Sequence, residues 1–264
     1  MDKLSNSLLE VYLENLNFLE NNFPDIFKKI VTLQSAIDNG QYKERWSLEY
    51  KDDSYFDLKY IEDDNLFYKT DSFKYSQDIA DETAMDTKDT FSMLYRDEDN
   101  KLALSRNYDK IKSIINHIND KVDFSNIKFR TINKYIFFGV GLALHIDYIF
   151  NKIKPLNTYI VEPDIEIFRL SMFITNYANF QFEDHKLFLS VGDDEYNRRE
   201  RLEEFYNYQP YMNYYIKYNI LSNNYKYLVD ETVYDQFFLR IYLALMNKWC
   251  NSPVFMPHLM TSYA

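Results

Sequence analysis

The sequence predicts an α/β protein whose main domain is a parallel sheet with helical connections, preceded by a small N-terminal unit of helices and an antiparallel meander. Three patterns support this fold class. Residues 4–19 carry apolar side chains at the helical period. From residue 46 to residue 68, apolar and polar residues alternate, which is typical of half-exposed strands. Between residues 135 and 191, short apolar runs alternate with helical patterns, as parallel strands and their crossovers do.

The N-terminal unit begins with two predicted helices. An apolar stripe from Leu4 to Leu19 defines the first of them. Pro24 interrupts this stripe and suits the first position of a second helix, because the N–H that proline lacks is not needed there. The second helix is expected to end near Ile37, since the turn-forming residues 38–40 follow it.

A meander is predicted after these helices. The alternating pattern gives three strands, at residues 46–50, 55–60 and 66–68. Acidic stretches at 51–54 and 62–65 separate the strands like hairpin loops. Short surface helices are expected within residues 76–100, and a longer helix within 105–121, where isoleucines share one face.

The strand–helix alternation that follows predicts a Rossmann-like sheet. We expect three adjacent parallel strands, with the first one central, at residues 135–138, 158–161 and 187–191. Their connecting helices are expected from about residue 142 to 153 and from 165 to about 177. A further helix is predicted at 195–206, with Asp193 or Asp194 as its N-cap, and another at 230–249. The predicted organisation is therefore a helical and meander unit at 1–120, a Rossmann-like domain at 121–225 and a helical connector at 226–264.

Composition limits the partners of the chain. Lysine and arginine total 30 against 41 aspartate and glutamate, which gives a formal net charge of −11 and a pI near 4.9. This charge argues against binding to nucleic acid or to anionic membranes, which require clustered cations. A single cysteine, Cys250, excludes an internal disulfide and fits a reducing, cytoplasmic location. The sequence contains no pattern typical of a signal peptide or of a membrane span.

A pair of glycines and a glutamate form the candidate binding site. Gly139 and Gly141 lie between a predicted strand and a helix, where the absence of a side chain permits close approach of a ligand or a tight turn. Glu162 ends the next strand, where an acid in nucleotide-binding folds accepts hydrogen bonds from ribose. Leu144 replaces the third glycine of the dinucleotide motif, which disfavours that class. Two interpretations stay open, a nucleotide site or a tight turn alone.

His145 lies one helical turn after Gly141 and has two possible roles. It is either a contact or acid–base group in the same crevice, or a partly buried residue bonded to a loop carbonyl, and we favour the structural role. The remaining histidines lack the spacing of a metal site. No motif of nucleophilic or phosphoryl-transfer catalysis occurs, so the catalytic residues stay unknown. The arginines at 198, 199 and 201 are expected to pair with Glu200, Glu203 and Glu204 of their own helix.

Two motifs carry a resemblance to a known family. The sequence IFFGVGLALHI at residues 136–146 and the sequence YIVEPDIEIF at 159–168 resemble the motility accessory factor (Maf) family of bacterial flagellin glycosyltransferases. Members of that family have an F-G-x-G-x-G-x-H turn, in which Ala143 here replaces the third glycine, and an I/V-x-E-P-x-x-x-x-F strand and helix. Asn15 to Ile26 also resembles the leading helix of the family.

The resemblance implies a role in attaching a nonulosonic acid, such as pseudaminic or legionaminic acid, to serine or threonine of flagellin from a CMP-linked donor. Flagellin and a nucleotide sugar are the implied partners, and no other cofactor is implied. Family members are much longer, and the G-x-G-P-S-L-like turn of their downstream transferase domain has no match here. The chain is therefore expected to be an N-terminal portion. Only Gly139, Gly141, His145 and Glu162 match motif positions, as a second Rossmann-like site or as scaffold.

Three functions remain in competition. The first is the N-terminal region of a flagellin glycosyltransferase, which acts as scaffold or presents the acceptor. The second is an independent α/β enzyme that binds a nucleotide or S-adenosylmethionine through the glycine turn. The third is a protein-interaction module that uses its tyrosine- and phenylalanine-rich surface. We favour the first, because it alone accounts for the order of the motifs.

Overall fold

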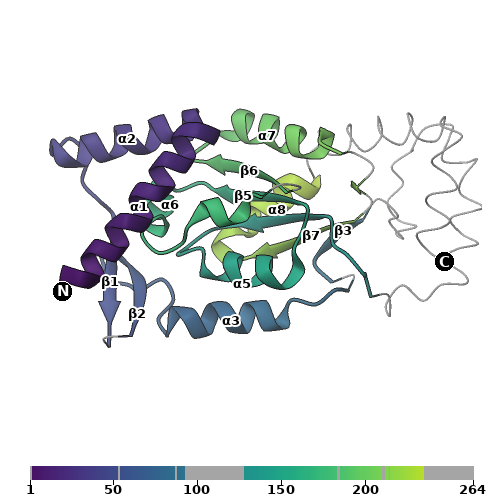
Figure 1. Cartoon of the computed structure of the whole chain (residues 1–264), viewed down its shortest axis with the longest axis horizontal. Coiled ribbons are helices and arrows are strands. Elements are labelled where there is room, and N and C mark those ends of the chain that lie inside the picture. The colour runs from purple at the N-terminus through teal and green to yellow at the C-terminus, as the bar shows by residue number, and fades with distance from the viewer. Residues whose placement is uncertain are drawn as a thin grey trace, which may run out of the picture.

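The computed structural model describes most of the chain (Figure 1). It covers residues 2–52, 54–86, 88–92, 128–182, 185–209, 212–213 and 215–234. The helix expected within residues 105–121 and most of the helix expected at 230–249 lie outside these ranges. Over the described ranges the chain is an α/β protein with a five-stranded sheet and a separate two-stranded hairpin, which confirms the predicted fold class.

The N-terminal unit has the predicted pair of helices and the start of the predicted meander. Helix α1 spans Asp2–Asn22, and α2 spans Pro24–Asp38 with the proline in its first turn. Strands β1 (Trp46–Lys51) and β2 (Tyr55–Tyr60) pair antiparallel. The third predicted strand forms only an isolated bridge, between Leu66 and Lys59. Helix α3 (Ser72–Glu82) follows, and the side chain of Asp71 accepts hydrogen bonds from its first N–H groups.

The main sheet has the strand order β3-β7-β4-β5-β6. The predicted strands correspond to β4 (Lys134–Phe138), β5 (Asn157–Glu162) and β6 (Lys186–Val191), which are adjacent and parallel, and β4 is the middle strand of the five. The sequence did not reveal β7 (Tyr215–Ile220), which pairs parallel with β4, or the short edge strand β3 (Thr90–Ser92), which pairs antiparallel with β7.

Helices cover both faces of the sheet. Helices α5 (Leu144–Ile153) and α6 (Ile165–Ser171) pack on one face, together with α1 and α2. Helices α7 (Glu195–Asn207) and α8 (Lys226–Tyr234) pack on the other face. Alternation within β4 supplies both cores, because Phe137 faces the first group and Phe138 the second. The connections that run from β4 to β6 and the one that returns to β7 thus use opposite faces, as right-handed crossovers require.

Helix α6 is shorter than the sequence suggests, and Asn15 of α1 accounts for the difference. Its side-chain amide donates 2.8 Å hydrogen bonds to the carbonyls of Met172 and Thr175, and its oxygen accepts the N–H of Tyr177 at 2.7 Å. These backbone groups would otherwise bond within a longer helix. The helix therefore ends at Ser171, and a short 3₁₀ turn, η2 (Tyr177–Phe180), follows.

The N-terminal helices share a core with the sheet. Leu19 and Ile30 are fully buried in the same cluster as Ile160 of β5 and Phe168 of α6. In Figure 1, α1, α2 and the β1–β2 hairpin gather at one end of the molecule, and α3 runs beside α5, on which it packs. The domain boundaries placed at residues 120 and 225 stay a prediction.

Candidate functional site

The glycine turn and the glutamate of the sequence motif meet at the carboxyl end of β4. Gly139 and Gly141 both have positive φ angles, of 88° and 52°, in the region that glycine adopts most readily. The turn is joined to β5 by a 2.9 Å hydrogen bond from Gly139 N–H to the carbonyl of Val161. A second bond, also of 2.9 Å, runs from the N–H of Val140 to Oε2 of Glu162. The spacing in the sequence thus brings these residues together.

Two tyrosines fill the space that a ligand would need beside the turn. A Cβ atom at Gly139 would collide with the ring of Tyr225, and one at Gly141 would collide with the hydroxyl of Tyr68. The Tyr68 hydroxyl also accepts the N–H of Leu142 at 2.8 Å. The glycines therefore permit close approach of the protein's own side chains, and the N–H groups of Val140 and Leu142 are already bonded to Glu162 and Tyr68.

Glu162 is fully buried and its carboxylate is bonded on both oxygens. Oε1 accepts the N–H of Asp164 at 2.9 Å, while Oε2 accepts the N–H of Val140 and the hydroxyl of Tyr225, the latter at 3.1 Å. Burial raises the pKa of Glu162 to about 7, and these three donors only partly oppose that shift. A ribose at this position would have to displace Tyr225.

His145 faces the core. Its side chain is fully buried, and its ring lies edge-on to Phe137 with the centroids 6.0 Å apart. Neither ring nitrogen makes a hydrogen bond of normal geometry within the described part of the chain. Burial lowers the pKa of His145 to about 3, and the interaction with the Gly139 backbone only partly opposes this shift. The imidazole is therefore neutral at physiological pH.

Two further carboxylates of the same motif anchor the hairpin, which the sequence reasoning missed. Glu166 is fully buried, and its Oε1 accepts the N–H groups of Arg45 and Trp46, each at 2.7 Å. Its Oε2 accepts the hydroxyl of Tyr42 at 2.8 Å. Asp164 caps α6 and pairs with the Arg45 guanidinium at 2.8 Å. Three acids within five residues, from the last residue of β5 onward, were the available signal in the sequence.

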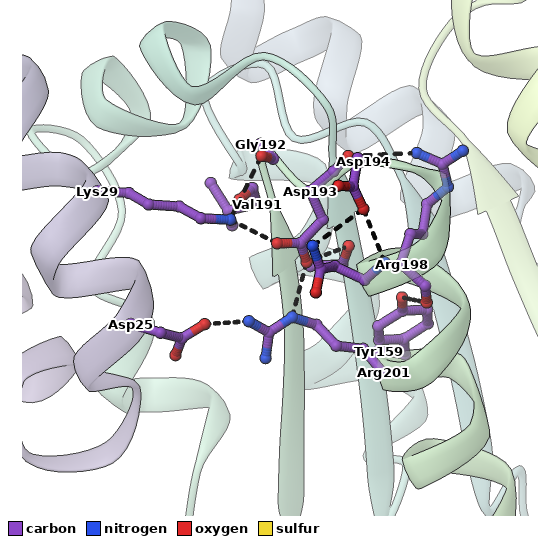
Figure 2. Close-up of polar contacts among 11 residues, drawn as sticks. Asp25, Lys29, Tyr159, Val191, Gly192, Asp193, Asp194, Arg198 and Arg201 are labelled. Carbon is purple, nitrogen blue, oxygen red and sulfur yellow. Dashed lines mark hydrogen bonds and ion pairs between the residues drawn. The ribbon is translucent and has the colours of Figure 1, made fainter.

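An ion-pair cluster ties α2 to the carboxyl end of β6 (Figure 2). Figure 2 shows Asp25 and Lys29 pointing from one helix toward Asp193 and Arg201. Asp193, whose side chain is 2% exposed, accepts Lys29 at 2.5 Å and Arg201 at 2.7 Å, and Arg201 also bonds to Asp25. The prediction that these arginines pair within their own helix is therefore wrong for Arg201, because a buried aspartate outside α7 binds it. Arg199 does pair within α7, but with Glu195, four residues earlier, and not with one of the three predicted glutamates.

The carboxyl edge of the sheet is thus held together by internal bonds. The described residues contain no group of three or more metal-ligating side chains close enough to hold an ion. Within the same ranges, no helix is long and apolar enough to cross a bilayer. The arrangement around Gly139 and Glu162 can fix the N-terminal unit on the sheet, because both oxygens of Glu162 are bonded to the protein's own donors. Whether Gly139, Gly141, His145 and Glu162 bind a ligand stays a prediction.

A family model identifies the family of the chain, and a solved structure has a similar fold. The sequence model of the family described as the glycosyltransferase Maf N-terminal domain matches residues 11–245. The fold is similar to the structure of the MAf glycosyltransferase from Magnetospirillum magneticum AMB-1, with a TM-score of 0.61 and 14% sequence identity. That likeness covers 87% of this chain and 35% of the other, so this chain spans about a third of that protein. No curated protein sequence gave a significant match.

Proposed function

The chain belongs to the Maf glycosyltransferase family, and we propose that it is the N-terminal region of a cytoplasmic flagellin glycosyltransferase, in which it acts as scaffold or presents the acceptor. The observation that carries the scaffold role is the internal bonding of the motif carboxylates. Glu162 holds the glycine turn and Tyr225, while Asp164 and Glu166 hold the segment that leads into the β1–β2 hairpin.

The transfer that we propose for the whole protein moves a nonulosonic acid, such as pseudaminic or legionaminic acid, from a CMP-linked donor to a serine or threonine hydroxyl of flagellin. This reaction requires a base near the acceptor hydroxyl and charge stabilisation on the departing phosphate. Among the residues described at the glycine turn, His145 is buried and neutral, and both oxygens of the buried Glu162 already accept hydrogen bonds from the protein. We therefore assign the chemical step to a part of the protein outside this crevice.

The experiment compares the chain alone with the chain joined to the downstream region of a Maf glycosyltransferase. Both are incubated with flagellin and CMP-pseudaminic acid, and the mass of flagellin is measured. We expect a mass increase only with the joined protein. In that protein, His145→Leu should keep most of the activity, because leucine preserves an apolar core position. Transfer by the chain alone that is lost in His145→Leu, while the variant stays folded, would contradict the scaffold role.

A further inference from the structure

A cavity of about 410 Å³ lies between the hairpin, α3 and the segment after β7. Four aromatic side chains form its walls, namely Trp46, Tyr60, Phe67 and Tyr75. Polar residues at its edge include Asp63, Asn65, Lys69 and Asn224. This volume and this mixture of aromatic walls with a few polar groups are typical of small-molecule sites. None of these residues belongs to the sequence motifs around Gly139 and Glu162.

The strand order of the sheet indicates that this cavity lies where ligands bind in open α/β sheets. Strand β4 connects through α5 to β5 on one side, whereas β7 returns to the opposite side of β4. The order of strands therefore reverses between β4 and β7, and open α/β sheets bind ligands outside the carboxyl ends of the strands at such a point. Ser222 and Asn224, which line the cavity, follow directly after β7. Tyr68, bonded to the turn after β4, packs its ring on Phe67 and Tyr75.

The aromatic walls are held in place before any ligand arrives. The indole N–H of Trp46 donates to Asp164 at 3.3 Å, and its ring packs edge-on against Tyr60 with the centroids 5.1 Å apart. The hydroxyl of Tyr75 donates to the carbonyl of Leu221 at 3.2 Å. A site whose rings are already oriented loses little conformational freedom on binding, so a given affinity requires fewer contacts with the ligand.

The chemistry of the lining favours an uncharged ring that carries hydroxyl groups. Aromatic faces suit the C–H surface of a sugar ring, and carboxylate and amide side chains suit its hydroxyls. Lys69 and Asp63 carry opposite charges, so the lining has no excess of cations for a phosphate. The backbone N–H groups of Val140 and Leu142 are bonded to Glu162 and Tyr68, so the nearby turn does not supply them to an anion. We propose that this cavity binds an uncharged pyranose ring of a glycan.

The test uses the fluorescence of Trp46. The chain has two tryptophans, so Trp249→Phe leaves Trp46 as the only indole. Methyl glycosides of glucose, galactose and N-acetylglucosamine are titrated into this protein, and saturation-transfer NMR records contact with the sugar protons. We expect at least one glycoside to change the Trp46 emission with a millimolar dissociation constant. Tyr60→Ala should weaken that binding by about tenfold, because it removes one aromatic wall.

Two controls keep the outcome unambiguous. Tyr196→Ala removes a tyrosine that is 68% exposed on α7, outside the cavity, and should leave the dissociation constant within about twofold of its original value. Thermal melting shows that each variant is folded. The proposal is wrong if no glycoside binds at high millimolar concentration, if Tyr60→Ala binds as well as the parent protein, or if CMP occupies the cavity in preference to every glycoside. The assay measures binding alone, so its result does not depend on sugar transfer.

Discussion

At the scale of single residues, the two glycines of the motif are explained by the tyrosines beside them. Gly139 has a φ angle of 88° and lies against the ring of Tyr225. Any other residue there would therefore have a strained backbone, and its Cβ atom would clash with that ring. The sequence indicated that these positions required glycine, but it could not distinguish a ligand from an internal side chain. Tyr225 is 86 residues away from Gly139 along the chain, and only the folded arrangement brings it to the turn.

Replacing Gly139 should therefore destabilise the protein more than replacing a glycine that has only backbone strain. We expect Gly139→Ala to lower the free energy of unfolding by about 2–4 kcal/mol, measured by urea denaturation. Gly40→Ala is the matched control, because Gly40 has a φ angle of 67° but no atom near its missing Cβ, and should cost about 1 kcal/mol. In the Tyr225→Ala background, Gly139→Ala should cost less than it does in the parent protein, because the space beside the turn is then open. Equal effects at Gly139 and Gly40 would contradict the role of Tyr225.

Glu162 should make the folded protein less stable as the pH rises toward 7, the opposite of what a salt-bridged carboxylate does. Because burial raises its pKa to about 7 in the folded protein, from about 4.5 in the unfolded chain, the folded state holds a proton more tightly. Its contribution to stability is complete below about pH 4.5 and is lost as the pH rises through about 7, with a total of about 3 kcal/mol.

Glu162→Gln removes this titration while keeping the shape of the side chain. We expect the difference in unfolding free energy between the parent protein and Glu162→Gln to shrink or reverse in favour of the variant as the pH rises from about 4.5 to 7. Urea denaturation at several pH values measures this difference. A constant difference across that range would show that Glu162 does not titrate there.

At the scale of elements, the strands with continuous apolar sequences were predictable and those with mixed sequences were not. Strand β4 contains the run Tyr135 to Phe138, which predicts a buried strand directly. Strand β7 reads YIKYNI, and its Lys217 looks like a surface residue. In the structure Lys217 is 2% exposed, and its ammonium group bonds to the carboxylate of Asp86 and the carbonyl of Lys88. A long-range partner therefore makes this lysine compatible with a buried strand, and no local pattern reveals such a partner.

The contact between α2 and α7 depends on Asp193. Because this carboxylate is buried and binds both Lys29 and Arg201, its removal takes the carboxylate partner from Lys29 and leaves Arg201 with only the more exposed Asp25. We expect Asp193→Ala to lower the free energy of unfolding by about 3 kcal/mol, measured by chemical denaturation. Glu195→Ala, which breaks an exposed pair with Arg199 in the same helix, should change it by less than about 0.5 kcal/mol. Similar losses in both variants would argue against a buried anchor.

At the scale of the whole molecule, the crevice that resembles a nucleotide site is closed by residues from distant parts of the chain. Tyr68 comes from the segment after the hairpin, Tyr225 from the region after β7, and Glu162 from β5. The sequence predicted three of the five strands in the described sheet and the position of the crevice, because apolar runs and glycine spacing are local patterns. It could not predict the closure, which depends on side chains from three separate segments.

The binding of nucleotides to this crevice tests the account most directly. Isothermal titration calorimetry with CMP and with S-adenosylmethionine is carried out on the parent protein and on Tyr225→Ala, after thermal melting shows that both are folded. We expect no measurable binding to the parent protein, because Tyr225 fills the space beside Gly139 and the Glu162 carboxylate is already bonded. Micromolar binding of either ligand to the parent protein, abolished by Glu162→Gln, would contradict the scaffold role and make the crevice a ligand site.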